Sequence, residues 1–200
     1  DLKRFRPNNK FNRYLRSIHN IPADKKIILY AGRFNNEKGI ETLAHAVLRL
    51  IKKGQNIVLM MIGSREDHSI DKVKEIFINY NKYLFILNHI NEIERYYNLS
   101  YLTCLPSNRE GFGMSLLESS ACGTPVVGSN IYGLQDSIIN NYNGFHFNKG
   151  DYFHLSIKIN DLICDKNKYL KFKANGIKLV KNKFNEHRVI NNFKNFISKY

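Results

Sequence analysis

Two glutamates around a glycine-rich turn are the residues whose types and spacing are best suited to chemistry. The segment E-G-F-G-M-S-L-L-E places Glu110 and Glu118 eight positions apart, with Gly111, Phe112 and Gly113 between them. Glycines have no Cβ, so the backbone can turn tightly and approach a ligand closely. A helix that begins after this turn directs its free N–H groups and the positive end of its dipole towards that ligand. The pattern favours an anionic ligand, although a glycine turn with two solvated glutamates is an open alternative.

The elements that position these residues alternate between short apolar runs and longer periodic stretches, which predicts a parallel sheet. We expect strands at 26–31, 56–62, 84–87, 101–105, 125–128 and 144–147, and helices at 39–53, 71–80, 93–99 and 114–122. The expected fold is therefore α/β, a Rossmann-like doubly wound parallel sheet of about six strands flanked by helices. Glycine-rich segments follow most of the strands. Because ligands of open parallel sheets bind beyond the carboxyl ends of the strands, we expect the site at that edge.

The segment after Gly150 has a different composition, rich in lysine, asparagine and apolar residues at helical spacing. It predicts helices at 152–164, 166–183 and 186–198. Without glycine-rich loops between them, these helices are expected to pack on the flank of the sheet and to carry no chemistry. We find no internal repeat or low-complexity linker, so one domain over 1–200 is the simplest description.

The charge balance indicates a basic protein, with 31 Lys and Arg against 17 Asp and Glu and a formal net charge of +14 at pH 7. Such an excess attracts anions, and an anionic membrane surface is an expected partner. An AT-rich genome is an alternative source of the lysines. No aromatic RNA-binding strand, zinc-ligand set or recognition-helix pattern occurs, so we expect no nucleic-acid partner.

The cysteines and the apolar runs bear on the compartment. Cys104, Cys122 and Cys164 are widely spaced among apolar residues, which predicts buried free thiols in a reducing compartment. The N-terminus lacks the apolar region of a signal peptide, and no apolar run approaches the roughly 20 residues that a bilayer needs. We therefore expect a cytoplasmic protein, peripheral on the inner face of the membrane.

Further glycines and cations follow one another in a fixed order along the chain. The ordered motifs are G-R at 32–33, E-K-G at 37–39, I-G at 62–63, the 110–118 segment, G-T-P-V-V at 123–127, G-L-Q-D at 133–136 and N-G at 143–144. Together they resemble the C-terminal, donor-binding half of a family-4 retaining glycosyltransferase (glycosyl transferases group 1), a two-domain GT-B enzyme. The resemblance covers about residues 25–150 and implies that the chain is one GT-B lobe.

The resemblance implies that Arg33 and Lys38, next to Gly32, grip the diphosphate of a nucleotide-sugar donor. Fixed cations at that place would stabilise the negative charge that develops on the leaving phosphate. No Asp-x-Asp motif for a metal occurs. The resemblance therefore implies that the reaction needs no metal and no other cofactor.

The same resemblance places Glu110 near the transferred sugar and Glu118 on the ribose, since a carboxylate can accept two hydroxyl hydrogen bonds. Whether Glu110 acts as a nucleophile or as an electrostatic stabiliser stays open. Backbone groups of the turn and of the first helical turn are expected to face the donor. These residues are Gly111, Phe112, Gly113, Met114 and Ser115.

Several positions depart from the family pattern. Gly63-Ser64-Arg65 stands where Gly-x-Gly is usual, so Arg65 is a candidate to enter the cleft. Asn88 replaces a glycine after the third strand, and we expect the turn to survive because asparagine tolerates positive φ. His89 is a candidate neighbour of the nucleotide base, although a packed or solvated histidine is the commoner case. Asp136 stands where the family often has Glu.

The implied activity of the full enzyme is transfer of a hexose-type sugar from a UDP- or GDP-linked donor to a glycan or lipid-linked acceptor, with retention of configuration. Residues 1–7, D-L-K-R-F-R-P, resemble the segment that joins the two lobes, so the acceptor-binding N-terminal domain is absent from this chain. We therefore expect donor binding but negligible transfer by these 200 residues alone. Two rival interpretations are a sugar-nucleotide epimerase of GT-B architecture and a non-catalytic sugar-nucleotide-binding module.

Overall fold

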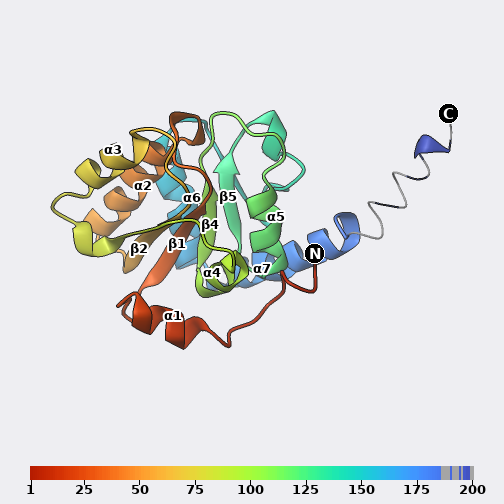
Figure 1. The fold of residues 1–200 in the computed structure, drawn as a ribbon, viewed down its shortest axis with the longest axis horizontal. Coiled ribbons are helices and arrows are strands. Elements are labelled where there is room, and N and C mark those ends of the chain that lie inside the picture. Colours follow the sequence, from red (N-terminus) through yellow and green to blue (C-terminus); the bar gives the residue numbers. More distant parts are fainter. Residues whose placement is uncertain (186–189, 191–193, 195, 199–200) are drawn as a thin grey trace.

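A parallel sheet forms the centre of the molecule (Figure 1). The computed structural model describes residues 1–185, 190, 194 and 196–198. Its strands are β1 (Lys26–Ala31), β2 (Ile57–Ile62), β3 (Leu84–Leu87), β4 (Leu102–Leu105), β5 (Val126–Ser129) and β6 (Gly144–Phe147). Their spatial order is β3-β2-β1-β4-β5-β6, and neighbouring strands pair in parallel. The predicted class of sheet is confirmed.

Helices and short 3-10 turns connect the strands. The helices are α1 (Asn12–Ile18), α2 (Ile40–Lys52), α3 (Ser69–Ile76), α4 (Ile93–Leu99), α5 (Met114–Ala121), α6 (Tyr152–Cys164) and α7 (Lys166–Lys183). The 3-10 turns are η1 (Asn36–Lys38), η2 (Asn81–Tyr83) and η3 (Tyr132–Leu134). The helix predicted at 186–198 falls mostly outside the described residues.

Two apolar layers lie on opposite faces of the sheet, because successive side chains of a strand point to opposite sides. In β1, Ile28 and Tyr30 pack in one layer while Ile27 and Leu29 pack in the other. Helices α2, α3 and α6 cover the first layer, and α4 and α5 cover the second (Figure 1). Burial on both faces explains why the strands read as continuous apolar runs. The doubly wound arrangement is thereby confirmed.

Most element boundaries agree with the predictions to within a residue, and helices α1 and α3 are the exceptions. Helix α1 was not predicted, because Leu15 is its buried residue and one buried side chain gives no apolar stripe. Helix α3 begins at Ser69 rather than at 71, because the Asp67 carboxylate accepts the Ser69 N–H at 2.7 Å. It also ends at Ile76 instead of 80, and the chain then forms η2.

One cysteine differs from expectation. Cys104 and Cys122 are buried, as predicted, but Cys164 is exposed, so the prediction of a third buried thiol is wrong. Helix α6 turns Leu155, Ile159 and Leu162 into the core. Cys164 lies two positions after Leu162, which rotates its side chain by about 200° around the helix axis.

The loops that carry the predicted site meet at the carboxyl edge of the sheet. The last residue of β1, Ala31, pairs with Ile62 of β2, which in turn pairs with Leu87 of β3. On the other side of β1, Leu105 of β4 pairs with Gly128 of β5. This register brings the ends of the strands to one edge, so the loops that follow them are neighbours in space.

Candidate functional site

The loops that follow β1 and β4 are held together at this edge. The Asn108 N–H donates to the Glu37 carbonyl at 2.7 Å. Gly39 has a φ of 61°, and a Cβ at this position would lie 2.2 Å from the carbonyl oxygen of Pro106. Glycine is therefore required here both for the left-handed conformation and for the close approach of the loops. This packing places Lys38, the last residue of η1, beside the loop after β4.

Lys38 and Glu110 form an ion pair. Nζ of Lys38 donates to Oε2 of Glu110 at 2.7 Å, and the Ser107 hydroxyl donates to the same oxygen at 3.3 Å. The two charged side chains are only 13% and 18% exposed. Loss of one partner would leave the other charge mostly buried and uncompensated. The fold thus joins two predicted catalytic residues from different loops.

The turn that carries Glu110 rests against η3. A Cβ on Gly133 would lie 1.8 Å from the carbonyl oxygen of Glu110 and 3.1 Å from that of Gly111. Gly113 has a φ of 69° and precedes α5 in a left-handed conformation. Gly111, by contrast, has no protein atom within 4 Å of its Cβ position. The packing of the protein therefore requires a glycine at position 133. At position 111 it does not, so the predicted role of Gly111 is to let a ligand approach the backbone.

Arg33, the other predicted cation, pairs with a carboxylate in the loop after β2. Its Nη1 donates to Oε1 of Glu66 at 2.9 Å, and the side chain is 58% exposed. Asn35 donates to the other oxygen of Glu66 at 2.6 Å. The Asn35 hydrogen bond, followed by the Arg33 guanidinium, lowers the pKa of Glu66, which keeps this carboxylate ionised. Glu66 holds Arg33 in place and competes with any anion that Arg33 binds.

Two positions that depart from the family pattern differ from what the sequence suggested. Arg65 does not enter the cleft, because its Nη2 lies 2.5 Å from Oδ2 of Asp71 and 2.9 Å from Nδ1 of His68. Asn88 has no positive φ, so the property for which asparagine was expected to suit this turn is not used here. Among the described non-glycine residues, a positive φ occurs at Asn20 and Asn141.

A cavity of about 400 Å³ lies between these loops, α4 and α5. Five predicted donor-binding residues line it: Gly32, Arg33, His89, Ser115 and Glu118. Arg4, Phe5 and Tyr97, which were not predicted, line it as well. Lys38 and Glu110 do not line it, and their ion pair lies in the adjoining loops. Glu118, predicted to bind the ribose, and Arg33, one of the two predicted cations, therefore line the same cavity.

Two other hollows lie outside this cavity, and one of them shares part of its lining. Phe112 and Met114 line an apolar hollow of about 460 Å³, where the Phe112 ring meets Phe184 edge-on with ring centroids 5.6 Å apart. A hollow of about 410 Å³ near Lys26, at the amino end of β1, contains none of the predicted site residues. Phe112 and Met114 thus do not line the cavity, but Glu118 and Phe5 line both the cavity and the apolar hollow, which adjoin there.

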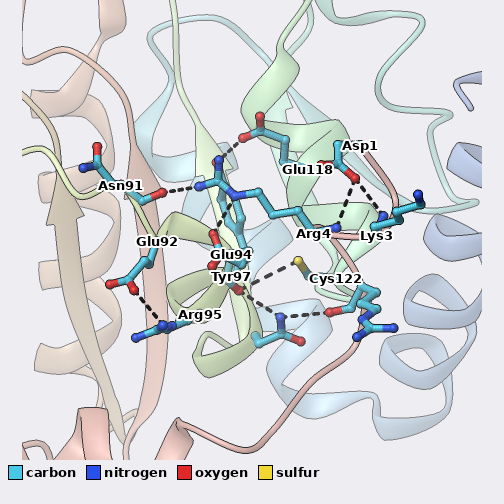
Figure 2. A network of polar contacts seen from close by, with 12 residues as sticks. Asp1, Lys3, Arg4, Asn91, Glu92, Glu94, Arg95, Tyr97, Glu118 and Cys122 are labelled. Atoms are coloured by element: carbon cyan, nitrogen blue, oxygen red, sulfur yellow. Dashed lines mark hydrogen bonds and ion pairs between the residues drawn. The ribbon is translucent and has the colours of Figure 1, made fainter. Parts of the chain in front are cut away.

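Glu118 is oriented by a buried tyrosine of α4. Its Oε2 accepts the Tyr97 hydroxyl at 3.0 Å (Figure 2). Burial raises the pKa of Glu118, while the Tyr97 hydrogen bond and the charge of Arg4 act in the opposite direction. Burial, with the Glu118 charge, also raises the pKa of Tyr97, so the hydroxyl stays a donor. The carboxylate is thereby held at the cavity wall, where it can accept hydroxyl groups.

The residues that sequence analysis missed lie one step away from those it found. Glu66 pairs with Arg33, and Tyr97 donates to Glu118. Arg4 lines the cavity beside Arg33 and Glu118. Glu66 follows the second strand closely, as Arg33 follows the first, so its position at the carboxyl edge was a usable signal. Tyr97 gave none, because it lies within the apolar pattern of a helix.

Neither a metal cluster nor a membrane span is found in the part of the chain that the structure describes. In that part, no three His, Cys, Asp or Glu side chains gather where they could hold an ion. No helix within it has the length and apolar character that crossing a bilayer requires.

Comparisons with known proteins bear on the family and the fold of this chain. The model of the family "Glycosyl transferases group 1" matches residues 12–179. The capsular polysaccharide biosynthesis glycosyltransferase CapM of Staphylococcus aureus is 33% identical over 174 residues, which cover 86% of this chain and 46% of CapM. A glycosyltransferase of Methanocaldococcus jannaschii is 30% identical over 66% of this chain and 34% of its own. The chain thus spans less than half the length of these relatives.

A solved structure shows the same fold at full coverage. Anabaena HepE, in complex with UDP-glucose, superposes with a TM-score of 0.90 at 18% identity. The match covers 100% of this chain and 56% of HepE.

Proposed function

Because this chain belongs to the glycosyl transferases group 1 family, we propose that it is the donor-binding half of a retaining, metal-independent glycosyltransferase. Its sheet and helices form one lobe of the GT-B fold. The donor that we propose is a hexose-type sugar on UDP or GDP. Transfer would need the acceptor-binding lobe of a longer protein, so these 200 residues alone are expected to bind donor without appreciable transfer.

The observation that carries the proposal is the ion pair between Lys38 and Glu110. In the reaction that we propose, the bond between the sugar's anomeric carbon and the diphosphate oxygen breaks, and its electron pair passes to the diphosphate. The oxygen of an acceptor hydroxyl forms the new bond to the anomeric carbon, and the proton of that hydroxyl passes to the departing diphosphate. Lys38 and Arg33 would stabilise that negative charge, because fixed cations beside it need no reorganisation during the reaction. Glu110 would face the positive charge that develops on the sugar. Breaking this bond separates charge, and a cation next to a carboxylate can stabilise both of the charges that develop.

The remaining donor contacts follow from the cavity. Glu118 would accept ribose hydroxyls, and backbone groups near Gly32 and Ser115 would approach the phosphates. His89 lines the same cavity and is the proposed neighbour of the base.

For the acceptor we propose a glycan or a lipid-linked glycan, as in polysaccharide assembly at the cell envelope. Support comes from CapM, a capsular polysaccharide biosynthesis glycosyltransferase, and from the net charge of +14, which suits an anionic membrane surface. We propose a cytoplasmic protein, peripheral on the inner face of that membrane. Binding to vesicles that does not depend on anionic lipid would remove the support from charge.

Thermal unfolding of this chain with UDP, GDP and ADP tests donor binding. A ligand that binds only the folded state at about 100 times its Kd should raise the midpoint by roughly 5 to 10 °C. Glu118→Ala and the double variant Arg33→Ala/Lys38→Ala should lose that shift, because they remove the ribose and diphosphate contacts. Lys149→Ala removes an exposed lysine of the turn before α6 and should keep it.

Two results would contradict the assignment. One is the absence of a shift with every nucleotide, both for this chain and for the longer protein. The other is a shift that survives in Glu118→Ala and in the double variant, which would move the nucleotide away from this cavity.

A further inference from the structure

The segment before α1 carries an arginine that is fastened to α4 (Figure 2). Nε of Arg4 donates to Oε2 of Glu94 at 2.9 Å, and its Nη2 donates to the carbonyl oxygen of Asn91. Glu94 lies in the first turn of α4, and Asn91 lies just before that helix. Two anchors from one element define the direction of a planar guanidinium far better than a single contact would.

Phe5, the residue after Arg4, holds the same segment against α4. Phe5 is 9% exposed and packs against Tyr97 with ring centroids 6.3 Å apart. The Arg4 guanidinium lies over the Phe5 ring at 4.9 Å from its centroid. Tyr97 in turn donates to Glu118 at 3.0 Å. A continuous set of contacts therefore runs from the segment before α1 to the carboxylate of the cavity.

Arg4 also lines the cavity that Glu118 lines. We propose that Arg4 is a positioning residue of the donor cavity, whose charge maintains Glu118 as a carboxylate that accepts the nucleotide's ribose hydroxyls. This inference rests on the proposed function. It assigns a part in donor recognition to a residue outside the strand-helix units that carry the other proposed donor contacts.

The charged and titratable groups around Glu118 explain why a cation is needed. Burial raises the pKa of Glu118, and the carboxylate of Glu94 raises it further. The Tyr97 hydroxyl and the Arg4 guanidinium lower it. A protonated Glu118 would present a hydroxyl donor and lose acceptor capacity, so its ligand contacts depend on this balance.

The sign of the pH dependence follows directly. Removal of Arg4 raises the pKa of Glu118, so the carboxylate takes up its proton at a higher pH than in the unaltered protein. Donor affinity should then fall on acidification, beginning at a higher pH. Arg4 is 43% exposed, so solvent screening limits the effect to about three- to tenfold in affinity.

The test measures the affinity of this chain for UDP-glucose by calorimetry between pH 5.5 and 8, with GDP-glucose instead if thermal unfolding favours guanine. The diphosphate of a nucleotide sugar is esterified at both ends, so neither phosphate titrates in this range, unlike a terminal phosphate with a pKa of about 6. Arg4→Ala should begin to lose affinity on acidification at a higher pH than the unaltered protein does, with an added loss of at most about three- to tenfold at the acidic end of the range. Arg4→Lys should restore most of the affinity at pH 6.

Two further variants separate this role from a structural one. Arg6→Ala removes the same charge from the same segment, but Arg6 does not line the cavity, so its pH profile should match that of the unaltered protein. In a Glu118→Gln background, Arg4→Ala should add no pH dependence, because the titrating group is gone. Arg4→Gln keeps a donor for the Asn91 carbonyl and takes the place of Arg4→Ala if the latter fails to fold.

An unchanged pH profile in both Arg4→Ala and Arg4→Gln would overturn the inference. So would a pH effect that persists without the Glu118 carboxylate. If the unaltered protein binds neither sugar nucleotide at any pH, the proposed function fails as well, and that outcome is distinct from the other two.

Discussion

Replacing Glu110 with glutamine in the longer protein is expected to lower the rate of sugar transfer about 10²- to 10³-fold while leaving nucleotide affinity nearly unchanged. Glutamine preserves the shape of the side chain and can still meet Lys38, but it lacks the negative charge. That charge is needed only as positive charge develops on the sugar, so its loss should lower kcat rather than binding. Steady-state kinetics, together with calorimetric Kd values for UDP, separate the two quantities.

A matched control is available in the same cluster. Ser107→Ala removes a 3.3 Å hydrogen bond to Oε2 of Glu110 without changing any charge. We expect it to lower kcat by less than about tenfold, the range of one neutral hydrogen bond. Full transfer by Glu110→Gln would refute the catalytic assignment of this residue, whatever the nucleotide affinity.

The second large effect is expected at Gly133, which is not a donor contact. In Gly133→Ala the new Cβ would lie 1.8 Å from the Glu110 carbonyl oxygen, a backbone atom that no side-chain rotation can move away. Either η3 or the turn after β4 must shift, which moves the Glu110 carboxylate away from Lys38. We expect about 10²-fold slower transfer, since small displacements of catalytic groups carry costs of this size. The unfolding free energy should fall by about 1 to 3 kcal/mol.

Gly111→Ala is the control for stability, because its Cβ would meet no protein atom within 4 Å. Its unfolding midpoint should equal that of the unaltered protein, although Gly111 belongs to the same turn that Gly133 packs against. Chemical denaturation of both variants, beside their transfer rates, makes the comparison. If Gly133→Ala retains both stability and transfer, the turn is more adaptable than its packing indicates.

The fold was largely predictable because its strands are buried on both faces. An apolar run such as 26–31 has no other stable place than the centre of a sheet, and β1 spans the same residues. Helix α1 was not predictable in this way, since it buries only Leu15 and is held by its surroundings. Cys164 was misjudged because the apolar residues near it were read as a buried environment, whereas the helix turns them to the other side.

The candidate site was predictable only where a motif exists. Lys38 and Glu110 were found by motif, but their contact depends on β1 and β4 being neighbours, which no local pattern states. Glu66 and Arg4 act on the site through other residues, so their roles can be inferred only from the distances in the structure. For Arg65 the sequence predicted too much. It lies beside a glycine turn, as a cleft residue would, but its guanidinium pairs with the nearby carboxylate of Asp71 instead of entering the cleft.

The strand order also determines when this site can exist during folding. Strands β1, β2 and β3 follow one another along the chain and join through short crossovers, whereas Ile28 of β1 meets Leu102 of β4 only after a long loop has closed. Such distant pairings are slow because their closure entropy precedes any stabilising contact. Lys38 belongs to the early half of the sheet and Glu110 to the late half. A folding intermediate with only the first three strands would therefore lack the Lys38–Glu110 pair, and nucleotide binding would report that β4 has joined the sheet.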